Sequence, residues 1–206
     1  MNARKISGHK VSYRTCGAIV VGAGAAGMNC AVHLHEFMTQ KGVAGAGGRI
    51  AVVTRGLSLG ASRMSGSDKQ TYYKLGTSPE TPDSAADFAR SLTAAGCCHE
   101  DLALIEGVAS LPEFYHLVRA GVPFPHDALG SYVGYKTDND PYERATSAGP
   151  KTSRFMSECL QRQPVQPHLP RRIDAGCVKL ARPAGRQHEV LAEKHVDLDL
   201  AARERP

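Results

Sequence analysis

The feature that most constrains the fold of this chain is a glycine-rich turn between an apolar run and a helix-favouring segment. Residues 17–21 are small or branched apolar residues, and residues 22–27 read Gly-Ala-Gly-Ala-Ala-Gly. The apolar run predicts a strand buried on both faces of a parallel sheet. Residues 25–37 favour a helix, whose sheet-facing side would carry Met28, Ala31, Val32 and His35.

A Gly-x-Gly-x-x-Gly turn in this position predicts a dinucleotide site. Gly22 permits the tight turn, and Gly24 lets the backbone approach a pyrophosphate. Gly27 lets the helix pack close to the strand. Free N–H groups and the positive end of the helix dipole would meet the phosphate charge. The alternative is a purely structural glycine turn. The predicted contact residues are Gly22, Ala23, Gly24, Ala25, Ala26 and Gly27.

A second buried strand is predicted over residues 49–53, after a glycine-rich loop over residues 39–48, and completes a β-α-β unit. It ends at Thr54 and Arg55, where the simplest dinucleotide rule has an Asp or Glu for the ribose hydroxyls. Arg55 is a suitable partner for a 2′-phosphate. The fingerprint alone therefore leaves NADP open beside FAD.

The sequence beyond this unit predicts mainly helices, placed by their capping and breaking residues. We expect an ordered loop with a short helix over residues 57–76 and a helix from Asp83 or Ser84 to about residue 95. A second helix would cover residues 100–110, with Leu102, Ile105, Val108 and Ala109 on one side. A third would begin at Pro112, bury Phe114, Leu117 and Val118, and end before Gly121. Residues 132–142 would form a loop, and residues 152–160 a last helix.

Composition and charge exclude several classes. The net charge is +5, but Lys and Arg are dispersed and not interleaved with aromatic residues, which argues against nucleic-acid binding. No apolar stretch is long enough to cross a bilayer, so we expect a cytoplasmic protein without membrane insertion. The six cysteines lack a regular spacing, which favours reduced thiols, and we predict no metal site.

One stretch carries a family resemblance. Residues 50–55, Ile-Ala-Val-Val-Thr-Arg, are followed by Gly-Ala-Ser-Arg-Met-Ser-Gly-Ser over residues 60–67. This resembles the FAD-dependent fumarate reductase, succinate dehydrogenase and L-aspartate oxidase flavoproteins, whose second strand commonly ends in Thr-Lys or Ser-Lys. The resemblance implies that Thr54 and Arg55 lie near the adenosine ribose. It places Ser62, Ser65, Gly66 and Ser67 near the flavin and pyrophosphate.

The resemblance extends over residues 17–160, through a helix and Gly-Val-x-Phe turn over residues 111–124 and an Arg and Thr region over residues 144–160. Two positions depart from the family pattern. Arg63 stands where the membrane-bound members carry a flavin-linked histidine, which implies noncovalent FAD. Ser67 replaces the second glycine of the Ser-rich segment.

The resemblance implies an α/β fold: a Rossmann-like FAD-binding domain with a parallel sheet in three layers. It implies hydride transfer between the flavin and a small dicarboxylate or amino acid, with an iron–sulfur or other electron-transfer partner. The family's catalytic positions lie beyond this chain, so we expect an incomplete chain. The loop candidates match no catalytic motif, and we predict no catalytic residue from among Arg119, His126, Lys136 and Arg144.

The two ends of the chain differ from its centre. Residues 1–16 are a polar leader that we expect to be mobile, and residues 17–160 form the predicted domain. The seven Tyr and five Phe residues all precede residue 161. We therefore expect residues 161–206 to be a disordered or non-family tail, either a frameshifted sequence or a natural extension. The functional alternatives are an NADP-dependent reductase and a noncatalytic truncated FAD-binding fragment.

Overall fold

The structure is a computed structural model that describes residues 2–6, 9–13, 15–66, 70–163, 175–179 and 191–196. The chain forms two compact units. The first comprises Met1–Met64 and Leu160–Pro206, and the second Ser65–Cys159. The predicted domain over residues 17–160 is therefore distributed over both units, which are described separately below.

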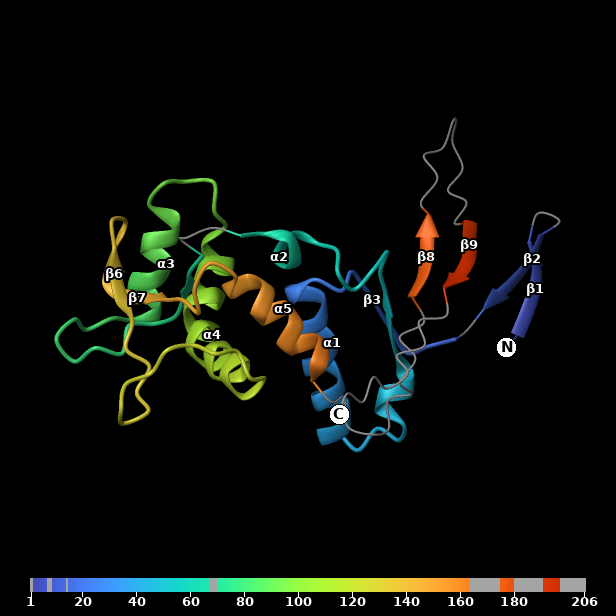
Figure 1. Ribbon diagram of the computed structural model, residues 1–206, viewed down its shortest axis with the longest axis horizontal. Helices are drawn as coiled ribbons and strands as arrows, with labels where there is room; N and C mark the ends of the chain where they lie inside the picture. The colour runs from blue at the N-terminus through green and yellow to red at the C-terminus, as the bar shows by residue number, and fades with distance from the viewer. Residues whose placement is uncertain are drawn as a thin grey trace, which may run out of the picture. The chain divides into compact units, whose positions relative to one another are not determined.

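The first unit contains the predicted β-α-β arrangement (Figure 1). Strand β3 (Ala18–Val21) and strand β4 (Ile50–Val53) pair in parallel, with Ala18 opposite Ile50 and Val21 opposite Val53. Helix α1 (Ala25–Gln40) connects them through the 3₁₀ helix η1 (Ala46–Arg49) and packs on both strands. The predicted helix face is confirmed in part, since Met28, Ala31 and Val32 are buried and His35 is half-buried.

The prediction that the first strand is buried on both faces is wrong. Ile19 is 63% exposed and Val21 is 82% exposed. Val20 lies between them and faces α1, because its Cγ1 is 3.6 Å from the position of a Cβ built on Gly27. Alternate residues of a strand point to opposite faces, so Ile19 and Val21 point away from the helix. In the described residues of this unit, one face of the parallel pair is thus open.

The first unit also contains two antiparallel hairpins, in segments where the sequence predicts no regular element. Strands β1 (Asn2–Ile6) and β2 (His9–Tyr13) form the first, within the predicted mobile leader. Strands β8 (Ala175–Lys179) and β9 (Leu191–Val196) form the second, within the predicted tail. The remainder of that tail from residue 164 on lies outside the described residues.

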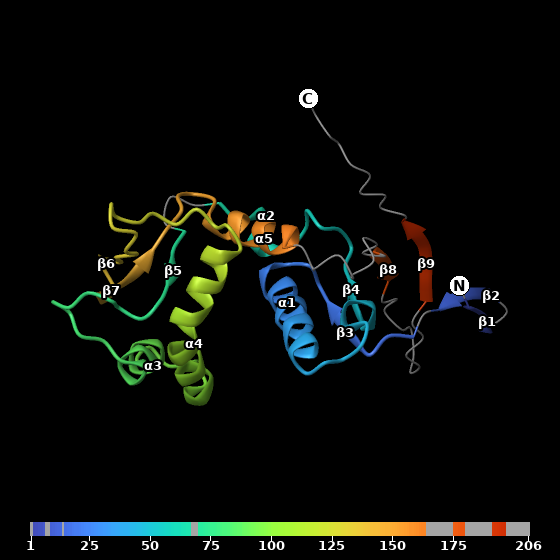
Figure 2. The ribbon, with the colours of Figure 1, turned by 90° about the horizontal axis from the view of Figure 1, so that it is seen from below.

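The second unit is built on a pair of helices, α3 (Ala85–Thr93) and α4 (Glu100–Arg119), which lie side by side (Figure 2). Of the two predicted caps, Asp83 and Ser84, the structure has Ser84 as the N-cap of α3, since its Oγ accepts the backbone N–H of Asp87 at 3.1 Å. The two helices predicted over residues 100–110 and from Pro112 are instead one helix, with Pro112 inside it. Packing on both sides of the proline outweighs the hydrogen bond that proline cannot donate.

The buried side of α4 also differs from the predicted one. Leu102, Ile105 and Val108 are exposed, whereas the neighbouring Gly107 lies against α3. A Cβ at Gly107 would lie 2.8 Å from the carbonyl oxygen of Ala85. The small residues thus define the contact, because they let the two helix backbones approach. The buried residues of α4 are Ala103, Gly107, Ser110, Phe114, His116 and Leu117.

A small antiparallel sheet and a last helix complete the second unit. Its strands are β5 (Tyr72–Tyr73), β6 (Tyr135–Thr137) and β7 (Asp140–Thr146), in the order β5-β7-β6. The loop predicted over residues 132–142 is therefore wrong in part, because Asp138 and Asn139 form the turn of the β6–β7 hairpin. Phe114 packs at the centre of an aromatic cluster with Tyr72, Phe124 and Tyr132. Helix α5 (Thr152–Arg162) starts at the predicted residue and continues past the end of this unit.

The fold is thus mixed α/β with a small parallel two-stranded sheet. The other strands in the described part of the chain are antiparallel, so the predicted parallel sheet is seen there with two strands, and its three layers are not seen. None of the helices among the described residues combines the length and apolar character that crossing a membrane requires.

Candidate functional site

The glycine turn after β3 adopts a geometry that requires its first glycine. Gly22 has a φ of +103°, in a region that side-chain-bearing residues rarely adopt. Its N–H donates to the carbonyl oxygen of Val53 at 2.7 Å. The turn is therefore anchored to the end of β4, and the carboxyl ends of the two parallel strands form one edge, where α/β folds bind their ligands.

Gly24 leaves free space at the start of α1. A Cβ at this position would meet no atom within 4 Å. Gly24 is the N-cap residue, with φ −71° and ψ −179°, and no side chain caps the helix there. The first turn, which begins with Ala25 and Ala26, carries no acidic residue. The first N–H groups of a helix have no partner within it, so this end suits an anion.

Gly27 lies against the turn itself. A Cβ at Gly27 would be 2.0 Å from the carbonyl oxygen of Gly22 and 3.6 Å from Cγ1 of Val20. The helix therefore approaches the turn more closely than any residue with a side chain would allow. The three glycines thus have the geometry expected of a dinucleotide-binding turn, and the space beside Gly24 is open.

The residues that follow β4 form a second loop at this edge. The Thr54 Oγ1 accepts the N–H of Gly56 at 3.3 Å and lies 3.2 Å from its carbonyl oxygen, while Arg55 is exposed. Gly60 then has a φ of +108°, and a Cβ there would be 3.8 Å from the Cα of Gly24. The start of the short helix α2 (Ala61–Met64) is thus next to the glycine turn.

One residue at this edge was not predicted from the sequence. Gln161, near the end of α5 and assigned to the first unit, donates from Nε2 to the carbonyl oxygen of Ala23 at 3.0 Å. The same nitrogen donates to the carbonyl oxygen of Leu57 at 2.9 Å. Since 138 residues separate Gln161 from Ala23, no local pattern in the sequence could have identified this contact.

The remaining predicted site residues belong to the Ser-rich segment that follows β4. Ser62 is half-buried in α2, within the first unit. Ser65 and Gly66 are exposed at the start of the second unit, and Ser67 lies outside the described residues. The structure therefore brings together the glycine turn, Thr54 and the start of α2.

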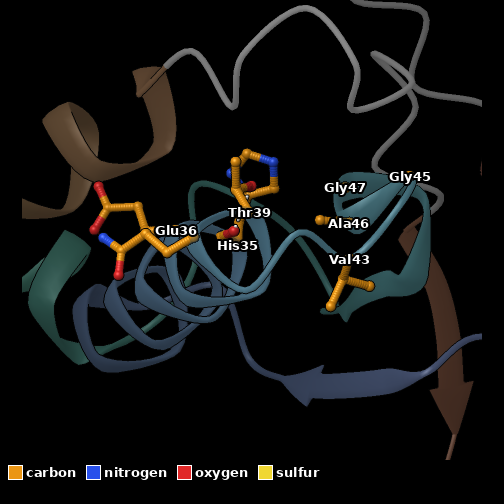
Figure 3. Close-up of a pocket in the computed structure, with 8 residues that line it drawn as sticks. His35, Glu36, Thr39, Val43, Gly45, Ala46 and Gly47 are labelled. Carbon is orange, nitrogen blue, oxygen red and sulfur yellow. Dashed lines mark hydrogen bonds between the residues drawn. The ribbon is translucent and has the colours of Figure 1, made fainter.

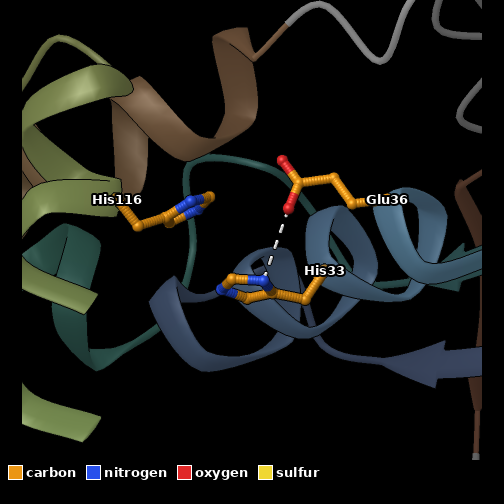
Figure 4. A group of neighbouring side chains, drawn as sticks. All are labelled: His33, Glu36 and His116. Carbon is orange, nitrogen blue, oxygen red and sulfur yellow. Dashed lines mark ion pairs between the residues drawn. The ribbon is translucent and has the colours of Figure 1, made fainter. Parts of the chain in front are cut away.

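The other end of α1 carries an open groove, shown in Figure 3. Its lining includes His35, Thr39, Val43 and Ala46. At 1.5 Å per residue, His35 is about 15 Å along the helix axis from its first residue. The groove is therefore separate from the glycine turn. On the same helix, Nδ1 of His33 lies 3.5 Å from Oε2 of Glu36, a contact between side chains one helical turn apart (Figure 4).

Among the catalytic candidates considered from the sequence, Arg144 is buried and makes contacts that support the fold. Its side chain is 3% exposed and binds Asp83 through Nη2 to Oδ1 at 2.6 Å and Nε to Oδ2 at 2.8 Å. Its guanidinium carbon lies 4.7 Å from the ring centroid of Phe88 and 4.2 Å from that of Tyr142. Burial by itself raises the pKa of Asp83, but hydrogen bonds from Arg144 and from backbone N–H groups hold it below its ordinary value.

The other candidates have exposed positions. Arg119 ends α4, His126 lies in the loop after it, and Lys136 lies in β6. A buried, fully paired Arg144 stabilises the second unit and offers no free group for catalysis.

Comparison with known proteins gives a match in structure. No protein-family profile and no curated protein sequence matches the chain. Among solved structures, Sdh1 of Mycobacterium smegmatis in complex with UQ1 is similar to this chain, with a TM-score of 0.57 and 19% sequence identity. The match covers 72% of this chain and 23% of the Sdh1 chain. A mutant form of FrdA of E. coli quinol fumarate reductase has a TM-score of 0.55 and 21% sequence identity. That match covers 72% of this chain and 24% of the FrdA chain.

The chain therefore spans about a quarter of the length of these neighbours. Over 72% of its own length, this chain shares the fold of part of the succinate dehydrogenase and fumarate reductase flavoproteins.

Proposed function

We propose that this chain is the FAD-binding part of a flavoprotein oxidoreductase, with a Rossmann-like dinucleotide site at the carboxyl ends of β3 and β4. The observation that carries the proposal is the glycine turn. Gly22 has the required positive φ, Gly27 contacts the turn backbone, and Gly24 leaves open space beside an uncapped helix N-terminus. A bound FAD would supply the redox chemistry, while this chain would bind and orient its pyrophosphate.

The wider reaction is part of the same proposal. By the resemblance of residues 50–67, the flavin would exchange a hydride with a small dicarboxylate or amino acid, and a redox partner such as an iron–sulfur protein would take or supply electrons. FAD would be held noncovalently, since Arg63 stands at the position of the flavin-linked histidine. Thr54 and Arg55 would lie near the adenosine ribose, and Ser62, Ser65, Gly66 and Ser67 near the flavin and pyrophosphate.

The visible absorption spectrum of the purified chain tests the proposal, before and after addition of FAD and desalting. We expect a flavin spectrum that survives desalting and is lost when the protein is unfolded, which would also confirm noncovalent binding. A colourless protein that gives no signal on titration with FAD would contradict it.

The alternative of an NADP-dependent reductase is carried by Arg55 alone, which is exposed after β4. A parallel titration with NADPH, followed by nicotinamide fluorescence, separates the two. NADPH binding without FAD binding would favour the alternative.

A further inference from the structure

The loops that follow β3 and β4 are joined by a single side chain. The Nε2 of Gln161 donates to the carbonyl oxygens of Ala23, at 3.0 Å, and of Leu57, at 2.9 Å. Both lengths lie in the ordinary range for N–H···O bonds. An amide group has two N–H hydrogens on its nitrogen, so the two acceptors match its donors. A carboxylate at this position could make neither bond.

The bond to Ala23 also determines the direction of the next N–H group. The described residues contain no cis peptide bond, and in a planar trans peptide the C=O and N–H groups point in opposite directions. The carbonyl oxygen of Ala23 points toward Gln161. The N–H of Gly24 therefore points away from Gln161. Gly24 is also the residue at which the absent Cβ leaves open space.

The bond to Leu57 holds a backbone carbonyl of the second loop. Residues 57 and 58 form a turn between β4 and α2, and Gly60 at the start of α2 is close to Gly24. By holding the Leu57 carbonyl, Gln161 fixes the distance between this loop and the glycine turn. The two loops form the edge at which the proposed nucleotide binds.

We propose that Gln161 is a positioning residue for dinucleotide binding. It holds the Ala23–Gly24 peptide from behind, so that the Gly24 N–H is oriented toward the pyrophosphate before FAD binds. The inference rests on the proposed function, and Gln161 itself does not touch the nucleotide. Preorganised donors of this kind increase affinity because no ordering cost is incurred on binding.

Two substitutions in the full 206-residue chain test this role. Q161M keeps the length of the side chain and removes both donors, whereas Q161E keeps its shape and replaces the donors with acceptors. Matched controls are Q163M and Q163E, since Gln163 follows two residues later and takes part in neither bond. FAD affinity is measured by quenching of flavin fluorescence, and folding by thermal unfolding of each variant.

We expect Q161M to weaken FAD binding about tenfold, as for the loss of two net hydrogen bonds, while both Gln163 variants stay within about twofold of the unmodified chain. Q161E should bind still more weakly at pH 7.5. Its affinity should recover as the pH falls toward 5, because a protonated carboxyl group can again donate to a carbonyl oxygen. Amide hydrogen exchange over residues 22–27 should be faster in Q161M without FAD.

FAD affinity within twofold of the unmodified chain for both Gln161 variants would overturn the inference and leave the proposed function intact. Absence of FAD binding by the unmodified chain would instead remove the proposed function, and the inference with it. If Q161M does not fold, the pH dependence of Q161E decides. An affinity of Q161E that does not change with pH would then count against the positioning role.

Discussion

A Cβ at Gly27 would lie 2.0 Å from the carbonyl oxygen of Gly22, whereas a Cβ at Gly24 would meet nothing within 4 Å. Two glycines of one turn are therefore required for different reasons. Gly27 is required by the fold, because backbone atoms occupy the space of a side chain. Among the described residues Gly24 has no such contact, so the proposed nucleotide would be the reason for a glycine there.

Substitutions at these two positions should separate stability from binding. G27A should lower the free energy of unfolding by about 3 kcal/mol or more, since the obstructing atom is a backbone oxygen. G24V should lower it by no more than about 1 kcal/mol, the scale of a changed N-cap, and yet reduce FAD binding to background. Chemical denaturation and FAD titration of both variants check this. Retained FAD affinity in G24V would contradict the proposed site.

Removal of one partner of the ion pair between Arg144 and Asp83 should strongly destabilise the second unit. Both side chains are almost fully buried, so R144M leaves a buried carboxylate without its partner and should cost about 3–5 kcal/mol. R154M is the matched control, because Arg154 pairs with Glu158 at a partly exposed site and should contribute less than about 1 kcal/mol. Urea denaturation measures both. Equal effects of the two substitutions would show that burial does not determine the contribution.

Acid should weaken the same pair. The pKa of Asp83 is lowered in the folded protein. The ionised carboxylate therefore contributes to stability above the pKa that Asp83 has in the unfolded chain. That contribution is lost as the pH falls through the lowered folded pKa. The free energy of unfolding should therefore decrease below about pH 4, and decrease less steeply in D83N. An unchanged slope in D83N would assign the acid sensitivity to other carboxylates.

Lys74 should give a dependence of the same direction, but at alkaline pH. Its side chain is fully buried. The Nζ atom donates to Thr77 Oγ1 at 3.1 Å and lies 5.6 Å from the ring centroid of Phe114. Burial lowers the pKa of Lys74 from its ordinary value of 10.5. Between the lowered folded pKa and the unfolded pKa, the unfolded state binds the extra proton, so stability should rise with pH.

K74M should remove this rise, and K136M, at an exposed lysine of β6, should retain it. Thermal unfolding between pH 7 and 10.5 provides the comparison. A rise that persists in K74M would contradict the assignment to this lysine.

Arg55 should matter little for FAD. It is exposed, and an exposed charge near a ribose contributes at most about 1 kcal/mol, so R55A should weaken FAD binding no more than about fivefold. An NADP site would instead depend on this guanidinium for the 2′-phosphate. Tight NADPH binding by the unmodified chain, abolished by R55A, would replace FAD with NADP in the proposal.

The β-α-β unit was predictable because its signals are local. The apolar runs that become β3 and β4, the glycines between β3 and α1, and the spacing of Met28, Ala31 and Val32 all occur within forty residues. The N-cap at Ser84 and the start of α5 at Thr152 are equally local. The exposure of Ile19 and Val21 was not predictable, since it depends on which other segments cover the pair.

The errors have a common physical cause in contacts between distant segments. The hydrophobic pattern of α4 favoured the side that carries Leu102 and Ile105, but Gly107 permits a closer approach of the α3 backbone. The pairing of Arg144 with Asp83, 61 residues away, likewise has no local signature. At the candidate site, Gln161 was missed for the same reason.

The contact between Gln161 and Ala23 also has a consequence in time. Ribosomes add about 5–20 residues per second, so the 138 residues between these two positions take roughly 7–28 s to synthesise. During that interval the glycine turn exists without the side chain that fixes its backbone. The proposed FAD site would therefore have a lower affinity until α5 has emerged, however early β3 and β4 come together.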